Sequence, residues 1–271
     1  MIYKKFLIVL LFTFFFISCN STTDPDRIEN NAYPLAENLE WEYNTIFYVE
    51  YYDTLGNIKN SVVLFDGNTI VRIESTKDTF SNFYDLIRIV SLDVKDYNKG
   101  INWYENKDDG LYVIAYKNAG ATQFVIPKII NGKKYLTLDE LKKINISLDL
   151  DLNLRKTSDD SLRFMTPPRK VLGYPLEIGN SWTELQYPFN RERIIESKEI
   201  KNIDGTDYQI FKIVANWKEF NLIFNDYIST KYGLVYREII SDSILITTTE
   251  SPDGIGYANT KTISKLVRKN F

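Results

Sequence analysis

Polar and apolar residues alternate along much of this chain, and this alternation constrains the fold more than any other feature. In the clearest run, 144–155, every second residue from Ile144 to Leu154 is apolar, and the residues between them are Asn, Ser, Asp or Arg. Because successive side chains of a strand point to opposite faces, this run predicts a long strand with one buried and one solvated face. Such strands are typical of antiparallel sheets that bury one side.

The same pattern predicts further strands at 42–51, 111–117, 193–200, 234–240 and 244–250, with strand-like runs at 69–73 and 208–213. Glycine-containing turn signals separate them. These signals are Leu55-Gly56-Asn57, Asp66-Gly67, Asp109-Gly110, Asn131-Gly132, Asp204-Gly205 and Pro252-Asp253-Gly254. Thr137 and Glu140 have the spacing of a capping box that opens a short helix to about Lys143. We therefore expect a mainly β fold, an antiparallel curved sheet or open half-barrel with little helix.

A short motif occurs twice. Tyr33-Pro34-Leu35 is followed by Trp41, and Tyr174-Pro175-Leu176 is followed by Trp182 at the same spacing. In each half a later Asp-Gly pair precedes one of the strand-like runs. Matched units of similar length indicate a duplication or a pseudo-symmetric arrangement. We therefore expect one β-rich domain over 33–271, built from two related halves at about 33–170 and 171–271, with both tryptophans in the core.

The N-terminal segment has the layout of a secretory signal peptide. Lys4 and Lys5 are followed by an apolar-rich run of 12 residues, Phe6 to Ile17, and then by Ser18 and Cys19. A membrane-spanning helix needs about 20 apolar residues, so this run is too short to span. The sequence predicts a signal peptide over 1–18 and a flexible polar tether over 19–32.

The lack of histidine and the single cysteine exclude several kinds of site. With no His anywhere and Cys19 as the only Cys, Ser-His-Asp and Cys-His catalysis are absent, and an ordinary zinc site lacks its preferred ligands. We expect no cofactor and no metal. Without residues 1–18 the chain carries 31 basic and 36 acidic residues, so its net charge of −5 gives no electrostatic reason to bind nucleic acid.

Two resemblances follow from these motifs. Ser18-Cys19 resembles the lipobox of bacterial lipoproteins, which implies cleavage before Cys19 and a lipid on its side chain. Tyr174 to Trp182, with the late segment Tyr232 to Glu238, resembles motifs of uncharacterised Bacteroidota lipoproteins. The first copy, Tyr33 to Trp41, departs from that pattern because it has Glu37-Asn38-Leu39-Glu40 where those proteins have a Gly-Asn pair. Some of those lipoproteins look similar to the LolA/LolB fold, which implies a half-barrel that holds an acyl chain.

Few residues stand out as a site. Trp103 and Trp217 have polar neighbours, which makes them the best candidates for aromatic contacts with a ligand. The acidic pairs Asp108-Asp109 and Asp159-Asp160 suit solvated turns better than catalysis. Residues 149–160 imitate a calcium loop, but Leu154 stands where such a loop needs glycine, so a strand is favoured.

The sequence thus predicts a protein of the cell envelope that is anchored to the membrane through Cys19. Asn20, rather than Asp, follows that cysteine, and by analogy with lipoproteins this favours the outer membrane, facing the periplasm or the cell surface. The expected function is a non-enzymatic binding or structural module with an apolar, glycan or protein ligand. The alternatives are an acyl-chain carrier or chaperone resembling LolA/LolB and a glycan hydrolase that uses carboxylates.

Overall fold

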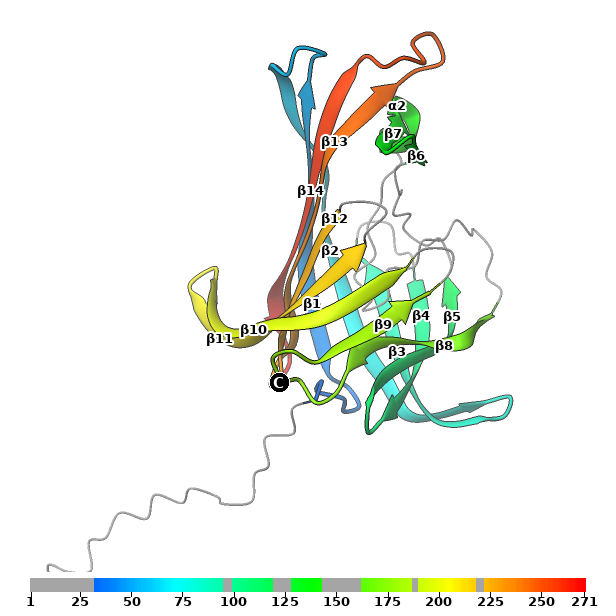
Figure 1. Ribbon diagram of the computed structural model, residues 1–271. Helices are drawn as coiled ribbons and strands as arrows, with labels where there is room; N and C mark the ends of the chain where they lie inside the picture. Colours follow the sequence, from blue (N-terminus) through cyan, green and yellow to red (C-terminus); the bar gives the residue numbers. More distant parts are fainter. Residues whose placement is uncertain (1–31, 95–98, 119–127, 143–161, 187–189, 218–221) are drawn as a thin grey trace, which may run out of the picture. The chain divides into compact units, whose positions relative to one another are not determined.

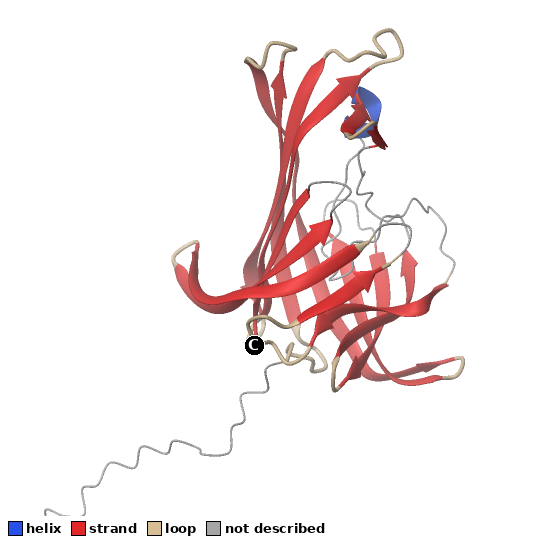
Figure 2. Ribbon diagram, in the orientation of Figure 1, coloured by secondary structure: helices blue, strands red, loops and turns tan. Residues whose placement is uncertain are grey.

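The computed structural model describes residues 32–94, 99–118, 128–142, 162–186, 190–217 and 222–271. About 76% of them lie in strands, which are almost all antiparallel, with one short helix among them (Figure 2), and this confirms the predicted fold class. The elements are β1 (Glu40–Tyr52), β2 (Ile58–Phe80), β3 (Phe83–Asp93), β4 (Lys99–Lys107), β5 (Gly110–Asn118), β6 (Lys128–Ile130), β7 (Lys133–Thr137), α2 (Leu138–Lys142), β8 (Arg163–Gly173), β9 (Ser181–Leu185), β10 (Arg191–Ile203), β11 (Thr206–Trp217), β12 (Leu222–Ser229), β13 (Gly233–Thr247) and β14 (Gly256–Lys269).

Twelve of these strands form one nearly closed, barrel-like sheet (Figure 1). Their order is β8-β5-β4-β3-β2-β1-β14-β13-β12-β11-β10-β9, so each half of the chain contributes six neighbouring strands. The first strand of the chain pairs with the last, β1 with β14, along nearly their whole length. At the other junction β8 and β9 lie beside each other, but they are the two ends of the hydrogen-bonded order.

The two copies of the Tyr-Pro-Leu motif share the turn that leads to their tryptophan, although the Tyr174–Pro175 peptide bond is cis and the Tyr33–Pro34 bond is not. Asn38 and Gly179, at the same position of each copy, both have positive φ, 65° and 90°. The amide of Asn38 donates to Ile73 O (2.9 Å) and that of Gly179 to Ile195 O (2.8 Å). In turn, the amide of Ile73 donates to Leu39 O (3.0 Å) and that of Ile195 to Asn180 O (2.9 Å), which again are equivalent positions of the two copies. The predicted equivalence of the two segments is therefore confirmed at the level of backbone hydrogen bonds.

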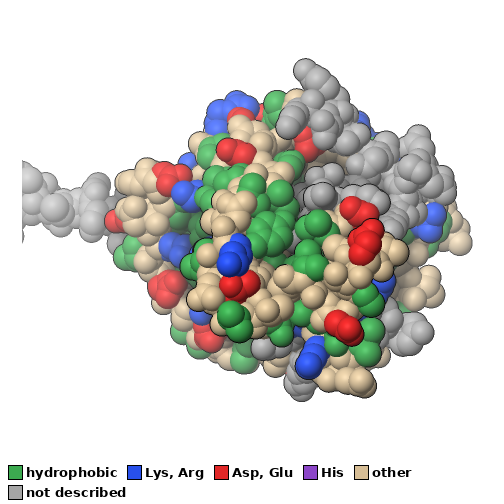
Figure 3. Space-filling model, turned by 90° about the horizontal axis from the view of Figure 1, so that it is seen from above, with side chains coloured by type: hydrophobic (Ala, Val, Ile, Leu, Met, Phe, Trp, Pro, Cys, Tyr) green, Lys and Arg blue, Asp and Glu red, His purple; other side chains and the backbone are tan. Residues whose placement is uncertain are grey.

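Both repeat tryptophans are buried, as predicted. Trp41 is 1% exposed, and its Nε1 donates to the carbonyl of Tyr232 (2.7 Å); Trp182 is 9% exposed, and its Nε1 donates to the carbonyl of Lys170 (3.1 Å). Both indoles belong to the largest hydrophobic cluster, which draws on both halves of the chain. The faces of β1 and β9 that carry them therefore line the inside of the sheet. Seen from above, hydrophobic side chains gather along the middle of the surface with charged side chains around them (Figure 3).

The junction between β8 and β9 is closed by side-chain packing. Trp182 of β9 lies over Gly173 of β8, where an added Cβ would be 2.7 Å from the indole ring. Its hydrogen bond to Lys170 O crosses the same junction. The predicted boundary between the halves, at 170 and 171, lies inside β8. In the strand order, β8 is the last strand of the first half and β9 is the first strand of the second, so the division lies after Gly173.

Two local predictions were wrong. Residues 234–240 and 244–250 were expected to be separate strands, but β13 runs continuously from Gly233 to Thr247, with a change of register between Ser241 and Ile244. Asp66-Gly67 is not a turn, because both residues pair with β1 in the middle of β2. The predicted strand at 144–155 lies outside the described residues.

The predicted short helix is present at the edge of the sheet. β7 pairs with β6 and, in parallel, with β13, and α2 follows it directly. The amide of Thr137 donates to Glu140 Oε2 (2.9 Å), and the amide of Glu140 donates to Thr137 Oγ1 (3.1 Å), which confirms the capping box. Within the described ranges, no helix is both long enough and apolar enough to cross a membrane.

Candidate functional site: a buried arginine cluster

Six charged side chains are buried together inside the second half of the sheet and its junction with β8. We call this group the arginine cluster. Each of its members is at most 6% exposed. The members are Arg169 of β8, Glu184 of β9, Arg191 and Arg193 of β10, Asp226 of β12 and Arg237 of β13.

The strand period turns these side chains inward. Glu184 lies two residues after the core residue Trp182, and Arg193 lies two residues before the core residue Ile195, so both point to the buried face. Asp226 and Arg237 are directly opposite each other in the pairing of β12 with β13. Regular alternation and strand pairing thus bring charges from β9, β10, β12 and β13 to one place.

The two carboxylates are held entirely by guanidinium groups. Arg193 bridges them: its Nε donates to Glu184 Oε2, and its Nη1 donates to Asp226 Oδ2 at 2.8 Å. Arg191 Nη2 donates to Glu184 Oε1 (2.5 Å). Arg237 donates twice to Asp226, from Nε at 2.6 Å and from Nη2 at 3.0 Å. These bonds between charged groups fix the positions of Arg191, Arg193 and Arg237.

Aromatic rings hold the faces of the same guanidinium groups. The Arg191 guanidinium lies 4.7 Å from the centre of the Trp217 ring. Phe224 lies between Arg193 and Arg237, at 4.9 and 5.0 Å from their guanidinium carbons. Cation–π contacts of this kind are worth about 2 kcal/mol or more when desolvated, so they further restrict the rotamers of the three arginines.

Within the described part of the chain, the cluster holds four guanidinium groups and two carboxylates. Among the described residues, Arg191 Nε, Arg191 Nη1 and Arg193 Nη2 are buried without a hydrogen-bond partner. Burying unpaired N–H donors costs free energy, about 1–3 kcal/mol for each group and more for charged ones. A packed core gains nothing from such donors, so they indicate a site rather than a scaffold.

The electrostatics of the cluster keep its carboxylates ionised. Burial alone would raise the pKa of Glu184, but the charges of Arg191, Arg193 and Arg169 outweigh burial and hold that pKa below its ordinary value. The pKa of Asp226 is likewise lowered, because Arg237 and Arg193 outweigh its burial.

The same burial acts on the guanidinium groups. It lowers the pKa of Arg169 to about 9 and that of Arg191 to about 10, and the positive charges of neighbouring arginines add to this effect. Both values remain above neutral pH, so these groups stay charged there.

Asn102 is a further buried polar group on the inner face. It is 0% exposed, and neither its Nδ2 nor its Oδ1 has a hydrogen-bond partner within the described part of the chain. It lies two residues before Tyr104 on β4, and Tyr104 is an electrostatic neighbour of Arg169. Unpartnered polar atoms therefore face the interior from β4 as well as from β10.

The structure separates the two tryptophans that the sequence singled out. Trp217 lies in the arginine cluster, stacked on Arg191. Trp103 packs in a different cluster, with Leu86 and Ile114, and its Nε1 donates to Asp78 Oδ2 at 2.8 Å. Both are buried, at 2% and 9% exposure, so neither forms an exposed aromatic surface.

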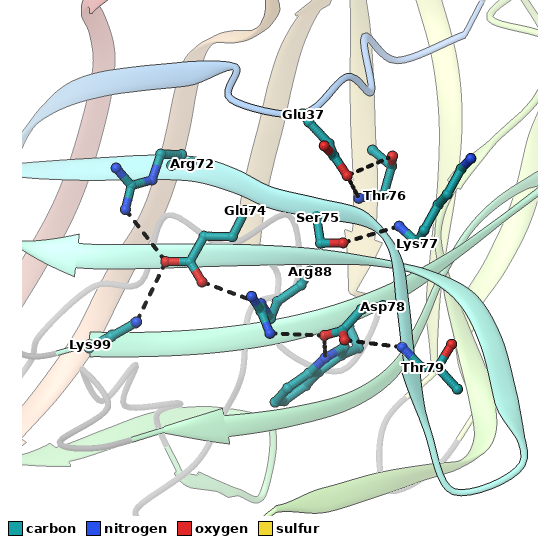
Figure 4. Close-up of polar contacts among 11 residues, drawn as sticks. Glu37, Arg72, Glu74, Ser75, Thr76, Lys77, Asp78, Thr79, Arg88 and Lys99 are labelled. Carbon is teal, nitrogen blue, oxygen red and sulfur yellow. Dashed lines mark hydrogen bonds and ion pairs between the residues drawn. The ribbon is translucent and has the colours of Figure 1, made fainter.

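The bond from Trp103 belongs to an ion network on β2, β3 and β4 (Figure 4). Arg88 contacts Glu74 at 3.3 Å and Asp78 at 3.2 Å, and Lys99 contacts Glu74 at 3.6 Å. The side chains of these two acids are more than 20% exposed, and such partly solvated pairs contribute little to stability. The network orients Trp103 but forms no enclosed site.

The remaining predicted candidates give no catalytic geometry. Asp109 is exposed in the turn between β4 and β5, where it pairs with Lys170 at 2.5 Å, and this contact lowers the pKa of its carboxyl. Asp159, Asp160 and Cys19 lie outside the described residues. Among the residues that the structure does describe, no group of three or more carboxylates, histidines or cysteines is arranged to hold a metal.

A shallow groove of about 420 Å³ lies on the outer face of β1, β13 and β14. Tyr48, Ile240 and Ile263 form its apolar part, and Glu50 and Lys261 are among its polar lining. Lys261 is already paired with Glu238 at 2.9 Å. The groove is therefore an open surface feature, in contrast to the enclosed arginine cluster.

Comparison with models of known protein families, with curated proteins and with solved structures found no match.

The sequence analysis missed the arginine cluster, although the sequence contained a signal for it. Trp182 was expected in the core, and a side chain two residues further along a strand shares its face, so Glu184 should have been expected there too. In the same way Arg193 shares the face of Ile195, while Ile194 is 42% exposed on the outside. Here the apolar residue points outward and the charged one inward, which composition alone does not reveal.

Proposed function

We propose that this protein is a lipid-anchored, non-enzymatic binding module of the cell envelope, and that it binds an anionic ligand at the arginine cluster. One observation carries the proposal: two arginines, each at most 2% exposed, keep three nitrogen atoms that have no hydrogen-bond partner among the described residues. An anion that accepts hydrogen bonds from these nitrogens relieves the desolvation of the donors.

The geometry supports binding over hydrolysis. A general acid works best with a pKa near the working pH, whereas the pKa values of Glu184 and Asp226 are held below their ordinary values. Arg193 donates to both carboxylates, so neither oxygen pair is directed at a substrate. The two acids serve to position arginines.

Binding at the cluster is also favoured over an acyl-chain carrier. Large buried side chains from both halves, including Trp41, Tyr43 and Ile210, belong to one continuous hydrophobic cluster. A carrier needs apolar volume for its cargo inside the sheet, and on this inner face the described apolar side chains pack against one another. The arginine cluster is instead polar and carries unused hydrogen-bond donors.

The proposed anchor and the proposed ligand are tested separately. Labelling cells with a radioactive fatty acid should mark the wild-type chain, and Cys19→Ala should abolish the label. For the ligand, native mass spectrometry of the full chain should show an additional bound mass that is anionic. Arg191→Gln should lose that mass. Arg72→Gln is the control and should retain it, because Arg72 is half-exposed and pairs with Glu40 outside the arginine cluster. Equal ligand loss in both variants would refute the assignment to the cluster.

A further inference from the structure

We propose that the groove on the outer face of β1, β13 and β14 binds a neutral oligosaccharide. This inference goes beyond the proposed function, because the groove and the arginine cluster lie on opposite faces of the sheet. It is based on the hollow that β-bulges make there, on two rows of side chains that differ in polarity, and on the hydrogen bonds that hold the polar row in place.

The groove lies where bulges bend the sheet. The pairing of β1 with β2 changes register between Phe47 and Tyr48, and that of β13 with β14 changes register between Ser241 and Ile244. A bulge bends its strand and increases the local twist, so the two changes of register account for a hollow on the outer side of a barrel-like sheet. The groove has a volume of about 420 Å³, within the roughly 300–1,000 Å³ of small-molecule sites.

Hydrogen-bonding side chains form the first row of the groove. Ser61, Glu50 and Asn259 lie opposite one another on β2, β1 and β14, and Asp242 follows on β13. Neighbouring strands are about 4.8 Å apart, so the row presents hydroxyl, carboxylate and amide groups at regular intervals. Such groups bond readily to hydroxyl groups, and a carboxylate alone has about four lone-pair sites.

Mainly apolar surface forms the second row, beside the first. Tyr48, Lys261 and Ile240 lie opposite one another on β1, β14 and β13, and Ile263 lies two residues after Lys261. The ammonium group of Lys261 pairs with Glu238 at 2.9 Å, so its alkyl chain adds to the apolar surface of the Tyr48 ring. A sugar ring is divided in the same way, since hydroxyl groups lie around its edge and C–H groups form its faces.

The polar row is fixed by bonds within the chain. The amide of Ser243 donates to Asn259 Oδ1 at 2.9 Å, and Asn259 Nδ2 donates to the hydroxyl of Tyr52 at 3.3 Å. That hydroxyl donates in turn to Glu50 Oε2 at 2.9 Å. The bonds therefore connect β13, β14 and β1. Groups that are positioned in advance lose little conformational entropy on binding, which favours a ligand whose hydroxyls also bond well to water.

The same surroundings favour an uncharged ligand. Glu50 and Asp242 lie beside the ammonium group of Lys261, so charges of both signs line the groove. A strongly charged ligand would meet like charges there, whereas hydroxyl groups donate to a carboxylate and accept from an ammonium group. An acyl chain would instead cover the polar row and leave its groups without partners, which costs free energy.

The experiment is binding of the full chain to an array of neutral glycans, followed by calorimetry with the oligosaccharide that binds best. The protein is kept in a polyoxyethylene detergent, which has no sugar head group. The comparison probes are sialylated and sulfated glycans, spermidine and octanoate. We expect a neutral oligosaccharide to bind at least about tenfold more tightly than each comparison probe, since those probes meet like charges or leave polar groups unpaired.

Two variants locate the binding. Glu50→Gln keeps the shape of the side chain but replaces a charged acceptor by a neutral one, so the affinity for the oligosaccharide should fall about fivefold to tenfold. Tyr48→Ala removes the aromatic surface and should lower the affinity by about tenfold. The matched controls, Glu199→Gln and Tyr84→Ala, change exposed residues outside the groove and should bind like the wild type. If Tyr48→Ala fails to fold, Glu50→Gln still carries the test, because Glu50 is exposed.

The outcomes distinguish this inference from the proposed function. Arg191→Gln should leave oligosaccharide binding unchanged, and Glu50→Gln should leave the anion at the arginine cluster. The inference is overturned if no neutral glycan binds above the background of the array, or if a charged or acyl probe binds most tightly. Unchanged affinity in both Glu50→Gln and Tyr48→Ala would also overturn it, because the oligosaccharide would then bind elsewhere on the protein.

Discussion

Replacing Asp226 by Asn should be among the most destabilising single changes in this protein. The carboxylate is 1% exposed and accepts three hydrogen bonds from charged groups, two from Arg237 and one from Arg193. The amide keeps the volume but removes the charge, so the net charge of the cluster becomes more positive by one. Breaking a buried ion pair at one partner costs about 3–5 kcal/mol, which is a large share of the 5–15 kcal/mol typical of a domain.

Urea unfolding near neutral pH measures this loss as a lower midpoint at an unchanged m value. Asp207→Asn is the matched control, because Asp207 is exposed and accepts a hydrogen bond from Asn202; it should change stability by less than about 0.5 kcal/mol. The double variant Asp226→Leu/Arg237→Met should recover much of the loss, since it removes one charge of each sign and leaves the net charge of the cluster unchanged. A loss below about 1 kcal/mol for Asp226→Asn would falsify the view that these charges are desolvated and interdependent.

Three further predictions concern acid stability, the junction and the repeat. The pKa values of Glu184 and Asp226 are lowered in the folded state, so the stability that these carboxylates contribute is complete above about pH 4 and is lost as the pH falls through their folded pKa values. Urea midpoints measured from pH 7 to pH 3 should therefore fall less steeply in Glu184→Gln than in the wild type. Gly173→Ala should lower the free energy of unfolding by about 1–3 kcal/mol, since the new methyl group meets the Trp182 ring, and an unchanged thermal midpoint would contradict the packing described at this junction. Gly179→Ala should cost about 1–2 kcal/mol because its φ is 90°, and calorimetry that finds no loss would refute the left-handed turn.

The architecture was largely predictable, because its two determinants are local. Alternation in single strands required a one-sided antiparallel sheet, and the recurrence of Trp41 as Trp182 indicated two related units. Strand boundaries were less predictable. Ser243 has a φ of 57°, which lets β13 change register where the sequence shows a polar break typical of a turn. The pairing of β1 with β14 joins segments that are distant in sequence, so no local pattern contained it.

The candidate site was much less predictable than the fold. Charged residues in a strand normally mark its solvated face, and β10 inverts this rule, with Arg193 inside and Ile194 outside. What decides the orientation is the register of β10 against β9, which places Arg193 opposite Trp182. Only after that register is known do Glu184 and Arg193 fall on one face. Alternation from Trp182 indicates that Glu184 points inward, but strand pairing is needed to bring Glu184 and Arg193 together in one site.

The meeting of β1 and β14 has a consequence for how this chain tolerates rearrangement. Asn270 N donates to Glu40 O (3.2 Å), so the start of the first strand and the end of the last strand are adjacent. A circular permutant that links these two ends and begins at Ser181 therefore keeps every strand pair of the order, because β8 and β9 share no backbone ladder. In such a chain the covalent link and the ladder would support the same junction. The other junction would be held by side-chain packing, including that of Trp182 on Gly173.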